Sequence, residues 1–449
     1  MACTLPPGPP LPALAQASLI WWDPVRFVRA CHQRYGDRFT VRIPRIGTLV
    51  YLADPDDIRS VIRGDPAVFH AGEAAEPLHQ VVGRQSLLTL DDGKHRRSRG
   101  MMLPAFHGEA VRRQIAEMAA VTADEVAQWP VGESFPVYPR MQRLTLEIIL
   151  RTVIGVRKES RLAELRSALP PLLEIGSPLE LIPPPRMLLR FGPWRRRAQR
   201  RAAALALLTD EITRCRADSR LAQRTDALAM LVRSVDGTGA PMTNEELLDQ
   251  LITLLLAGHD TTATALSWAF ERLTRHPTLL SRTAQAAADG EDAWLEAVCK
   301  ESLRVRPVVF EFGRKLTAPV HLAGHRIPAG TILTPSINLV HHASRHYPDP
   351  DEFRPQRFLD HRPDPALWLP FGGGVRRCLG ATFAQVEMRT VLREVLRRLE
   401  LSPTTAPDEP ARPHHVTMVP RQGAMLTVHR RLDAATIRAS LHDNQRTQV

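Results

Sequence analysis

The stretch "LPFGGGVRRCLGATFAQ", residues 369–385, places one cysteine between a glycine-rich turn and the start of a predicted helix. Two nucleotide-binding patterns can be tested against it. A phosphate-binding loop has the pattern G-x-x-x-x-G-K-[ST], but no lysine follows Gly380. A dinucleotide fingerprint requires a third glycine where this chain has Arg377. Both patterns therefore fail on their own residues.

Cys378 stands just before the predicted helix N-terminus. The helix dipole and free backbone N–H groups favour an anion there, and Arg376 and Arg377 add positive charge. We therefore expect a lowered pKa for the Cys378 thiol. A thiolate at this position can be a nucleophile or a metal ligand. On this stretch alone, a buried structural cysteine remains an equal alternative.

The composition is that of an ordinary soluble globular protein, with 44% hydrophobic and 24% charged residues, and the length of 449 residues suits a single large enzyme. The chain has no C-x-x-C pair, which argues against a disulfide framework and for a reducing compartment. Its five cysteines are Cys3, Cys31, Cys215, Cys299 and Cys378. We find no apolar run long enough to span a bilayer, so we expect a cytoplasmic protein without a transmembrane anchor.

The formal net charge is +11. One interpretation is a generally basic surface, and the other is a face that attracts an acidic partner. Nucleic acid is a poor candidate for that partner, because aromatic residues make up only 5% and do not interleave with the basic ones.

Helical patterns dominate the chain, most clearly over 108–230, 243–274 and 380–399. Thr243 and Glu246 have the spacing of a capping box at the start of the second helix. Alternating segments predict a hairpin over 39–54 and a closing hairpin over 418–430. Because strands do not alternate with helices, we expect a mainly α fold with a small β portion, an α+β class, rather than a doubly wound sheet.

The long central helix contains "LLLAGHDTTATALSW", residues 254–268. Gly258, Asp260 and Thr261 are all unfavourable in the middle of a helix. Local rules broken together often mark a functional site. The small residue can open a groove for a small ligand, and the acid–alcohol pair can relay protons. A solvated kink is the alternative, although the apolar flanks argue against it.

Two further motifs pair charged or polar side chains on one helix face. "KESLR" places Glu301 and Arg304 three residues apart, and Arg357 in "FRPQRF" can complete a buried triad. "GKHRRSRG" sets His95 and Arg99 one turn apart, either as a solvated basic face or as two donors for an anionic group.

These motifs together resemble those of the cytochromes P-450. The family's haem-ligand loop, F-x-x-G-x-R-x-C-x-G, is filled by Phe371, Gly374, Arg376, Cys378 and Gly380. "AGHDTT" resembles the oxygen-activation motif, "KESLR" the E-x-x-R motif, "FRPQRF" the meander and "GKHRRSRG" the propionate-binding helix. Five motifs occur in the family's order, over residues 39–429.

The resemblance implies a haem b (iron protoporphyrin IX) cofactor between the central helix and the cysteine loop. Cys378 would be the metal ligand, and Phe371 would pack beside it. Ala257 and Gly258 would leave space for dioxygen, while Asp260 and Thr261 would deliver protons as the catalytic pair. The haem propionates would be bound by His95, Arg99, Arg314 and Arg376.

The resemblance also implies domain limits and an activity. We expect a proline-rich lead-in with a first helix (1–38), one haem-thiolate catalytic domain (39–430) and a polar tail (431–449). The activity would be insertion of one oxygen atom into a lipophilic substrate, by hydroxylation or epoxidation of a terpene, steroid, fatty acid or polyketide. The implied pocket residues are Leu87, Leu88, Leu254, Ala257, Thr261, Val308, Val309, Phe310, Val416 and Thr417.

Electrons would come from NAD(P)H through a separate ferredoxin or flavodoxin with its reductase, because no reductase domain follows the last predicted hairpin. A haem-thiolate isomerase or dehydratase and a non-catalytic haem-binding sensor are alternatives, but neither needs the Asp260–Thr261 pair. The basic stretch 194–201 is either a solvated helix face or a contact with a membrane surface or an anionic substrate.

Overall fold

The computed structural model describes residues 5–173, 192–359, 363–414 and 416–432, and helices make up most of them. The helices are α1 Ala13–Trp22, α2 Pro24–Tyr35, α3 Pro55–Arg63, α4 His79–Val82, α5 Asp92–Met102, α6 Glu109–Arg112, α7 Ile115–Val126, α8 Tyr138–Ile149, α9 Glu159–Ala168, α10 Pro170–Leu173, α11 Gly192–Arg216, α12 Ala227–Arg233, α13 Asn244–Arg275, α14 Pro277–Asp289, α15 Asp292–Val305, α16 Ile337–His341 and α17 Ala381–Arg398. The expected mainly α architecture is confirmed.

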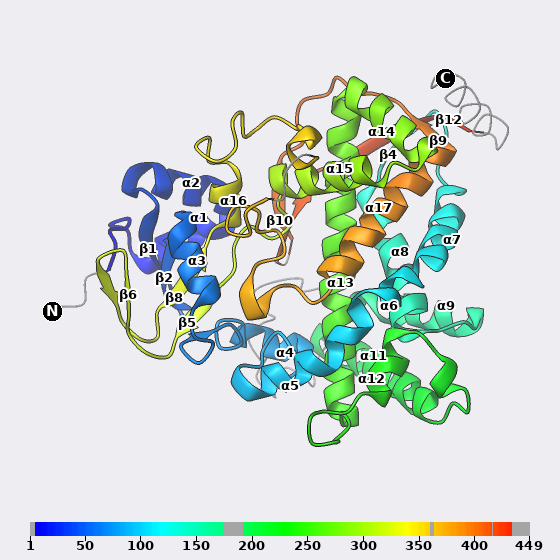
Figure 1. Cartoon of the computed structure of the whole chain (residues 1–449), viewed down its shortest axis with the longest axis horizontal. Coiled ribbons are helices and arrows are strands. Elements are labelled where there is room, and N and C mark those ends of the chain that lie inside the picture. Colours follow the sequence, from blue (N-terminus) through cyan, green and yellow to red (C-terminus); the bar gives the residue numbers. More distant parts are fainter. Residues whose placement is uncertain (1–4, 174–191, 360–362, 415, 433–449) are drawn as a thin grey trace.

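The strands are short: β1 Arg38–Ile43, β2 Gly47–Leu52, β3 Phe69–His70, β4 Ser134–Pro136, β5 Arg314–Leu316, β6 Val320–Leu322, β7 His325–Ile327, β8 Ile332–Pro335, β9 Leu399–Leu401, β10 Ala411–His414, β11 Thr417–Pro420 and β12 Met425–Arg431. The largest sheet has the order β1-β2-β8-β5-β3, and β2 and β8 run parallel in it. Smaller sheets are formed by β4-β12-β9, by β10-β11 and by β6-β7. The five-stranded sheet lies at the left of Figure 1, and it packs against α2 on one face and against α3 and α16 on the other.

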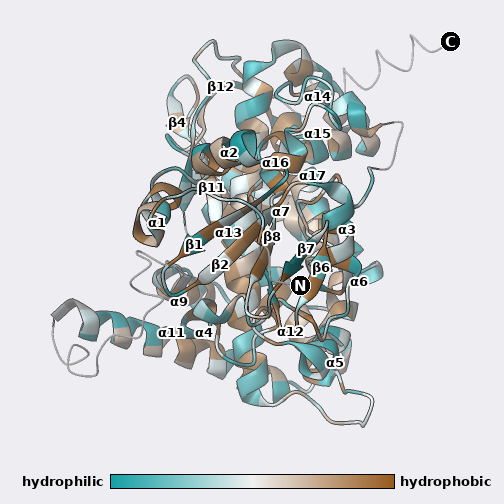
Figure 2. Cartoon of the chain, turned by 90° about the vertical axis from the view of Figure 1, so that its left-hand side faces the viewer, coloured by the Kyte–Doolittle hydropathy of each residue, from teal (hydrophilic) through white to brown (hydrophobic). Residues whose placement is uncertain are grey.

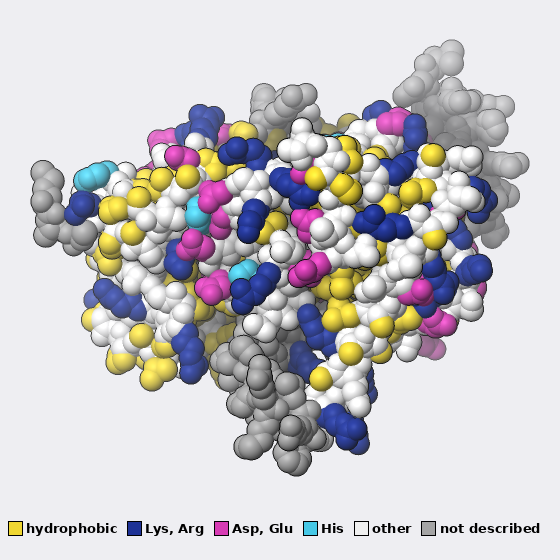
Figure 3. Space-filling view, turned by 90° about the horizontal axis from the view of Figure 1, so that it is seen from below, with side chains coloured by type: hydrophobic (Ala, Val, Ile, Leu, Met, Phe, Trp, Pro, Cys, Tyr) yellow, Lys and Arg dark blue, Asp and Glu magenta, His cyan; other side chains and the backbone are white. Residues whose placement is uncertain are grey.

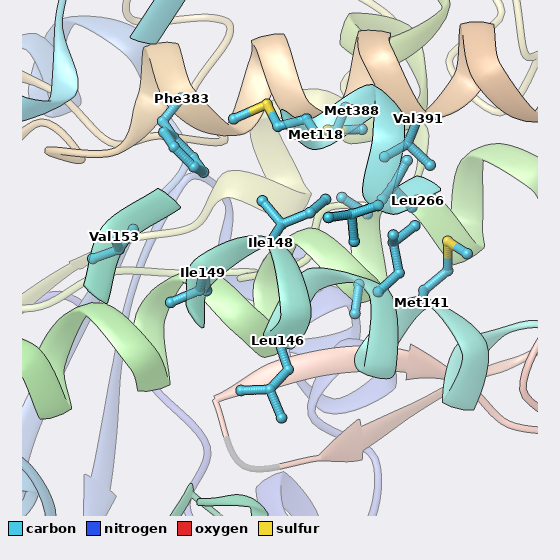
Figure 4. Close-up of a cluster of buried hydrophobic side chains, with 14 of the residues drawn as sticks. Met118, Met141, Leu146, Ile148, Ile149, Val153, Leu266, Phe383, Met388 and Val391 are labelled. Carbon is cyan, nitrogen blue, oxygen red and sulfur yellow. The ribbon is translucent and has the colours of Figure 1, made fainter. Parts of the chain in front are cut away.

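Helix α13 runs through the middle of the molecule, and α8 and α17 pack along it (Figure 1). Its predicted start is confirmed, because the Thr243 hydroxyl accepts the Glu246 N–H (3.1 Å) and the Glu246 carboxylate accepts the Thr243 N–H (2.7 Å). Figure 4 shows Ile148 and Ile149 of α8 in the apolar core between α17 and α13. This core fixes the helices that carry the candidate site.

The predicted hairpin over 39–54 is confirmed as the antiparallel pair β1–β2. The predicted closing hairpin over 418–430 is wrong. Its two halves are strands, but β11 pairs with β10, whereas β12 pairs with β4 and β9. Gly423 (φ 86°) and Ala424 (φ 58°) turn the chain between them, and the buried Glu409 carboxylate accepts the Ala424 N–H (3.1 Å). A long-range contact therefore directs the two strands to different partners.

The proline-rich lead-in lies against β1, since the Thr40 backbone N–H donates to the Pro7 carbonyl (2.8 Å) and the Thr40 hydroxyl to the Pro6 carbonyl (2.7 Å). The division of the chain at residue 38 stays a prediction. Most of the expected tail, residues 433–449, lies outside the described residues. In the described part of the chain, no helix has the length and apolar character needed to cross a membrane.

Candidate functional site

The cysteine loop is closed by its own backbone. The Cys378 N–H donates to the Phe371 carbonyl (2.9 Å), a short 3-10 turn spans Gly374–Arg376, and α17 begins three residues after the cysteine. Gly374 has φ 63°, and a Cβ there would collide with the carbonyl oxygen of Ile62 in α3. The loop needs glycine at this position because of both its backbone conformation and the close approach of α3.

The side chain of Cys378 is exposed, yet desolvation raises the pKa of its thiol. The expected lowering is therefore wrong. The Gly380 N–H, Arg377 and Arg99 do lower the Cys378 pKa, but the desolvation effect is larger. The sulfur becomes a thiolate there most readily when a cation such as a metal ion binds it.

Four basic side chains predicted to bind the propionates lie close enough to influence one another's titration. Burial lowers the pKa of His95 to about 4, with Arg376 and Arg99 adding to the effect. Burial also lowers the pKa of Arg314 to about 10, and Arg376 contributes. Arg99 has neither an ion pair nor a side-chain hydrogen bond within the residues that the structure describes, and its pKa is lowered by desolvation. This concentration of positive charge fits a ligand with carboxylate groups.

Arg376 already has protein partners in the structure. It pairs with Asp91 and donates to the Leu87 carbonyl (3.3 Å). Asp91 also accepts the backbone N–H of Gly72 (2.9 Å) and of Glu73 (2.9 Å). Asp91 is not among the site residues predicted from the sequence. An aspartate directly before a helix is common as an N-cap, so its position carried no separate signal.

On α13, Ala257 is exposed and Thr261 is partly exposed, although most neighbouring residues along the helix are buried. The Thr261 hydroxyl donates to the Ala257 carbonyl (2.5 Å), and the helix is continuous through this point. Gly258 lies next to α8. A Cβ at Gly258 would lie 3.1 Å from Ile149 Cδ1, so this glycine lets α8 approach closely. Its expected role beside a ligand stays a prediction.

Asp260 is held by side chains from α8 and from the β10–β11 hairpin. Its Oδ1 accepts the Tyr138 hydroxyl (2.5 Å) and the Gln142 amide (3.2 Å), and its Oδ2 accepts the Thr417 hydroxyl (2.9 Å). His414 Nδ1 lies 3.6 Å from Oδ2. Burial alone would raise the pKa of Asp260, but His414, Tyr138 and Thr417 hold it well below its usual value. Asp260 is therefore an anion.

Asp260 is predicted from the sequence, but its hydrogen-bond partners are not. Tyr138 and Gln142 are four residues apart on α8, a spacing that places them on one helix face and nothing more. No hydrogen bond joins Asp260 to Thr261 within residues 5–173, 192–359, 363–414 and 416–432.

The predicted pocket segments are joined to α13 and to each other. The Leu87 N–H donates to the Gln250 side chain (3.0 Å), which attaches the loop before α5 to α13. The Met418 N–H donates to the Val308 carbonyl (2.8 Å), which attaches β11 to the segment after α15. The structure thus joins segments that lie more than a hundred residues apart in the chain. Only the family resemblance had assigned these segments to one pocket.

The predicted triad is confirmed. Arg304 binds Glu301 through two hydrogen bonds (2.7 and 2.8 Å), both side chains are fully buried, and Arg357 Nε lies 3.4 Å from the Glu301 carboxylate. Arg304 also donates to the His341 (2.8 Å) and Pro350 (2.7 Å) carbonyls. The group therefore anchors the segments that follow α15, which is a structural role.

Comparison with known families indicates whether Cys378 is a nucleophile, a metal ligand or a structural cysteine. A sequence profile described as Cytochrome P450 matches residues 6–428. The chain belongs to the cytochrome P450 family. Family membership makes it a haem- and iron-containing oxidoreductase of the monooxygenase type, and the resemblance deduced from the motifs is confirmed.

Two relatives are from Mycobacterium tuberculosis. The chain is 51% identical over 437 residues to a protein designated cytochrome P450 135B1, covering 96% of this P450 and 93% of the relative. It is 40% identical over 425 residues to one designated cytochrome P450 135A1, covering 94% of each.

Two solved structures share the fold. Retinoic acid bound cyanobacterial CYP120A1 superposes with a TM-score of 0.81 at 24% identity, covering 96% of this P450 and all of that chain. The cytochrome P450DA heme domain superposes with a TM-score of 0.81 at 22% identity, covering 97% and all of that chain. At such identities these likenesses establish the fold alone.

Proposed function

We propose that this P450 binds haem b through Cys378 and inserts one oxygen atom from dioxygen into a lipophilic substrate. The observation that carries the proposal concerns Arg99. Its charge acts on the Cys378 thiol and also on His95, so the desolvated thiol and the basic cluster both adjoin the space around the Arg99 side chain. Haem matches both needs of this space, because it has an iron for the sulfur and two carboxylates for the basic side chains.

Haem with a thiolate ligand supplies the activation of dioxygen. The chain's own residues bind and orient it. The carboxylates would be held by charge-assisted hydrogen bonds from His95, Arg99, Arg314 and Arg376. Phe371, whose carbonyl accepts the Cys378 N–H (2.9 Å), fixes the direction of the ligand loop.

Proton delivery would use Asp260 and Thr261. The Thr261 hydroxyl is the group on the open side of α13, and its bond to the Ala257 carbonyl orients it. Asp260 faces α8 and the β10–β11 hairpin. For a proton to pass from the Asp260 carboxyl to Thr261, the acid must first release at least one of its donors.

The substrate would be a terpene, steroid, fatty acid or polyketide, because the pocket segments are apolar apart from Thr261 and Thr417. NAD(P)H would supply the electrons through a ferredoxin or flavodoxin with its reductase, in the cytoplasm. The net charge of +11 favours an acidic partner. Lys and Arg side chains are mixed with Asp and Glu on the face seen in Figure 3, so we assign no single docking site for it.

The test is a reconstituted reaction of the purified holoprotein with NADPH, a ferredoxin, its reductase and a lipophilic library. Compounds that shift the haem spectrum are first selected and then followed to oxygenated product. Thr261→Ala should keep both the haem and the spectral shift but divert electrons to hydrogen peroxide. Turnover of a selected compound without dioxygen or reductant would instead establish the isomerase or dehydratase alternative.

A further inference from the structure

Helix α1, "ALAQASLIWW", exposes its largest apolar side chains and Ser18, whereas it buries Gln16. It contains no charged residue. Leu14 is 74% exposed, Trp21 65% and Trp22 87%, whereas Gln16 is 1% exposed. A surface helix ordinarily has the reverse arrangement. This face of α1 therefore leaves a large apolar area in water, which is unfavourable by about 25 cal/mol for each Å².

Hydrogen bonds of the Gln16 side chain fix the orientation of α1 about its axis. Its side-chain amide donates to the Leu11 carbonyl (2.7 Å), and its side-chain oxygen accepts the Arg42 backbone N–H of β1 (2.9 Å). These bonds fix Gln16 toward the sheet. The apolar side is thereby held outward.

The exposed apolar residues gather here instead of being scattered. Of the thirteen large apolar side chains exposed in the described chain, six form what we call the α1 patch: Leu11, Leu14, Leu19, Trp21, Trp22 and Ile46. Figure 2 shows α1, largely brown, at the edge of the molecule beside β1 and β2. A gathered apolar patch on a protein surface marks an interaction site.

The residues around the α1 patch are basic. Arg26 and Arg29 on α2, Arg42 on β1 and Arg45 in the β1–β2 turn are all exposed. None of these four arginines forms an ion pair with another residue of the part of the chain that the structure describes. The nearest carboxylate in the sequence, Asp23, accepts the Arg26 backbone N–H (3.0 Å) as a helix cap. The surroundings of the patch therefore suit an anionic surface.

We propose that the α1 patch binds the surface of an anionic phospholipid bilayer. An uncharged apolar helix face with tryptophans, bordered by arginines, matches the chemistry of the membrane interface, where indole rings lie at headgroup level and guanidinium groups bind phosphates. Ten residues of helix extend only about 15 Å, half of a bilayer's apolar thickness. The helix therefore lies on the membrane and does not span it.

The experiment is sedimentation of the full-length holoprotein with vesicles of equal parts phosphatidylcholine and phosphatidylglycerol, and with vesicles of phosphatidylcholine alone. We expect binding to the anionic vesicles that weakens as salt is raised. The double variant Trp21→Ala/Trp22→Ala should bind at least tenfold more weakly. Val235→Ser, which changes an exposed apolar residue elsewhere, should bind like the parent.

Charge is tested separately by Arg42→Glu/Arg45→Glu against Lys94→Glu/Arg96→Glu, an equal change of charge on the exposed side of α5. Only Arg42→Glu/Arg45→Glu should bind the anionic vesicles at least tenfold more weakly than the parent. An unchanged CO-complex spectrum shows that each variant is folded. The proposal is overturned if the parent binds neither vesicle, if both charge reversals weaken binding equally, or if sedimentation velocity shows a dimer that Trp21→Ala/Trp22→Ala dissociates.

Discussion

Tyr138 of α8 donates a hydrogen bond of 2.5 Å to the Oδ1 of Asp260 on α13, across 122 positions of the sequence. This bond holds the acid of the acid–alcohol pair toward α8, while Thr261 points to the open side of the helix. The same acid accepts the Thr417 hydroxyl from the β10–β11 hairpin (2.9 Å). Asp260, the acid that we propose for proton transfer, is thus tied to two elements outside its own helix.

The Tyr138–Asp260 bond should be measurable in a double-mutant cycle. Hydrogen bonds to a charged group contribute roughly 1.5–3 kcal/mol, so Tyr138→Phe should lower the free energy of unfolding by about that amount at pH 7, and much less in an Asp260→Asn background. Because the folded pKa of Asp260 is lowered, this stabilisation is complete above its usual pKa of 3.8 and is lost as the pH falls further. Urea unfolding at several pH values measures the coupling and its pH dependence. If Tyr138→Phe lowers the free energy of unfolding equally with and without Asp260→Asn, the two side chains are not coupled.

Cys378→Ala should abolish the red-shifted Soret band of the ferrous–CO complex, because no other thiolate would bind the iron. Cys31→Ala removes a thiol that is also free but buried in α2, and it should leave the band unchanged. Absorption spectra of the two reduced, CO-treated variants are compared. A persistent band in Cys378→Ala would show that the ligand is another residue.

Arg99→Gln should weaken haem retention, since it removes a cation that has no ion pair within the described residues and whose charge acts on the Cys378 thiol. A lost charge-assisted hydrogen bond of roughly 1.5–3 kcal/mol corresponds to about ten- to a hundredfold in haem affinity. Arg96→Gln removes an exposed arginine from the same helix and is the matched control. Haem transfer to apomyoglobin measures the loss rate, and equal rates in the two variants would count against propionate binding.

Glu311 should make the stability of the folded protein fall with rising pH. Burial raises its pKa to about 7, although the neighbouring Tyr51 hydroxyl lowers it. A folded pKa above the usual value of 4.5 means that the folded state holds the proton more tightly, so its stabilisation is complete below that value and is lost as the pH rises to about 7. Glu311→Gln should remove this dependence, which amounts to roughly 1–3 kcal/mol. The free energy of unfolding of the parent and of Glu311→Gln is measured with urea from pH 5 to 8. If it depends on pH in the same way in both proteins, Glu311 titrates normally.

Local sequence patterns predicted those helices and turns well whose stabilising contacts join residues close together in the chain. The Thr243–Glu246 capping box is an example, because its two bonds join residues three apart. The closing hairpin was predicted incorrectly for the opposite reason. The partner of β12 is chosen by contacts with β4 and β9, far away in the sequence, and alternation along a strand does not identify its partner.

The sequence by itself determined which chemistry the site can carry, because the residue types around Cys378 and the order of the motifs are properties of the chain. Only the tertiary structure decided the pKa of that thiol, the partners of Asp260 and the outward side of α1. Desolvation raised the pKa of Cys378 against the local helix dipole and arginines. Tyr138 reached Asp260 only through the packing of α8 on α13. Burial and long-range contacts exist only once distant segments are packed together, so no local pattern records them.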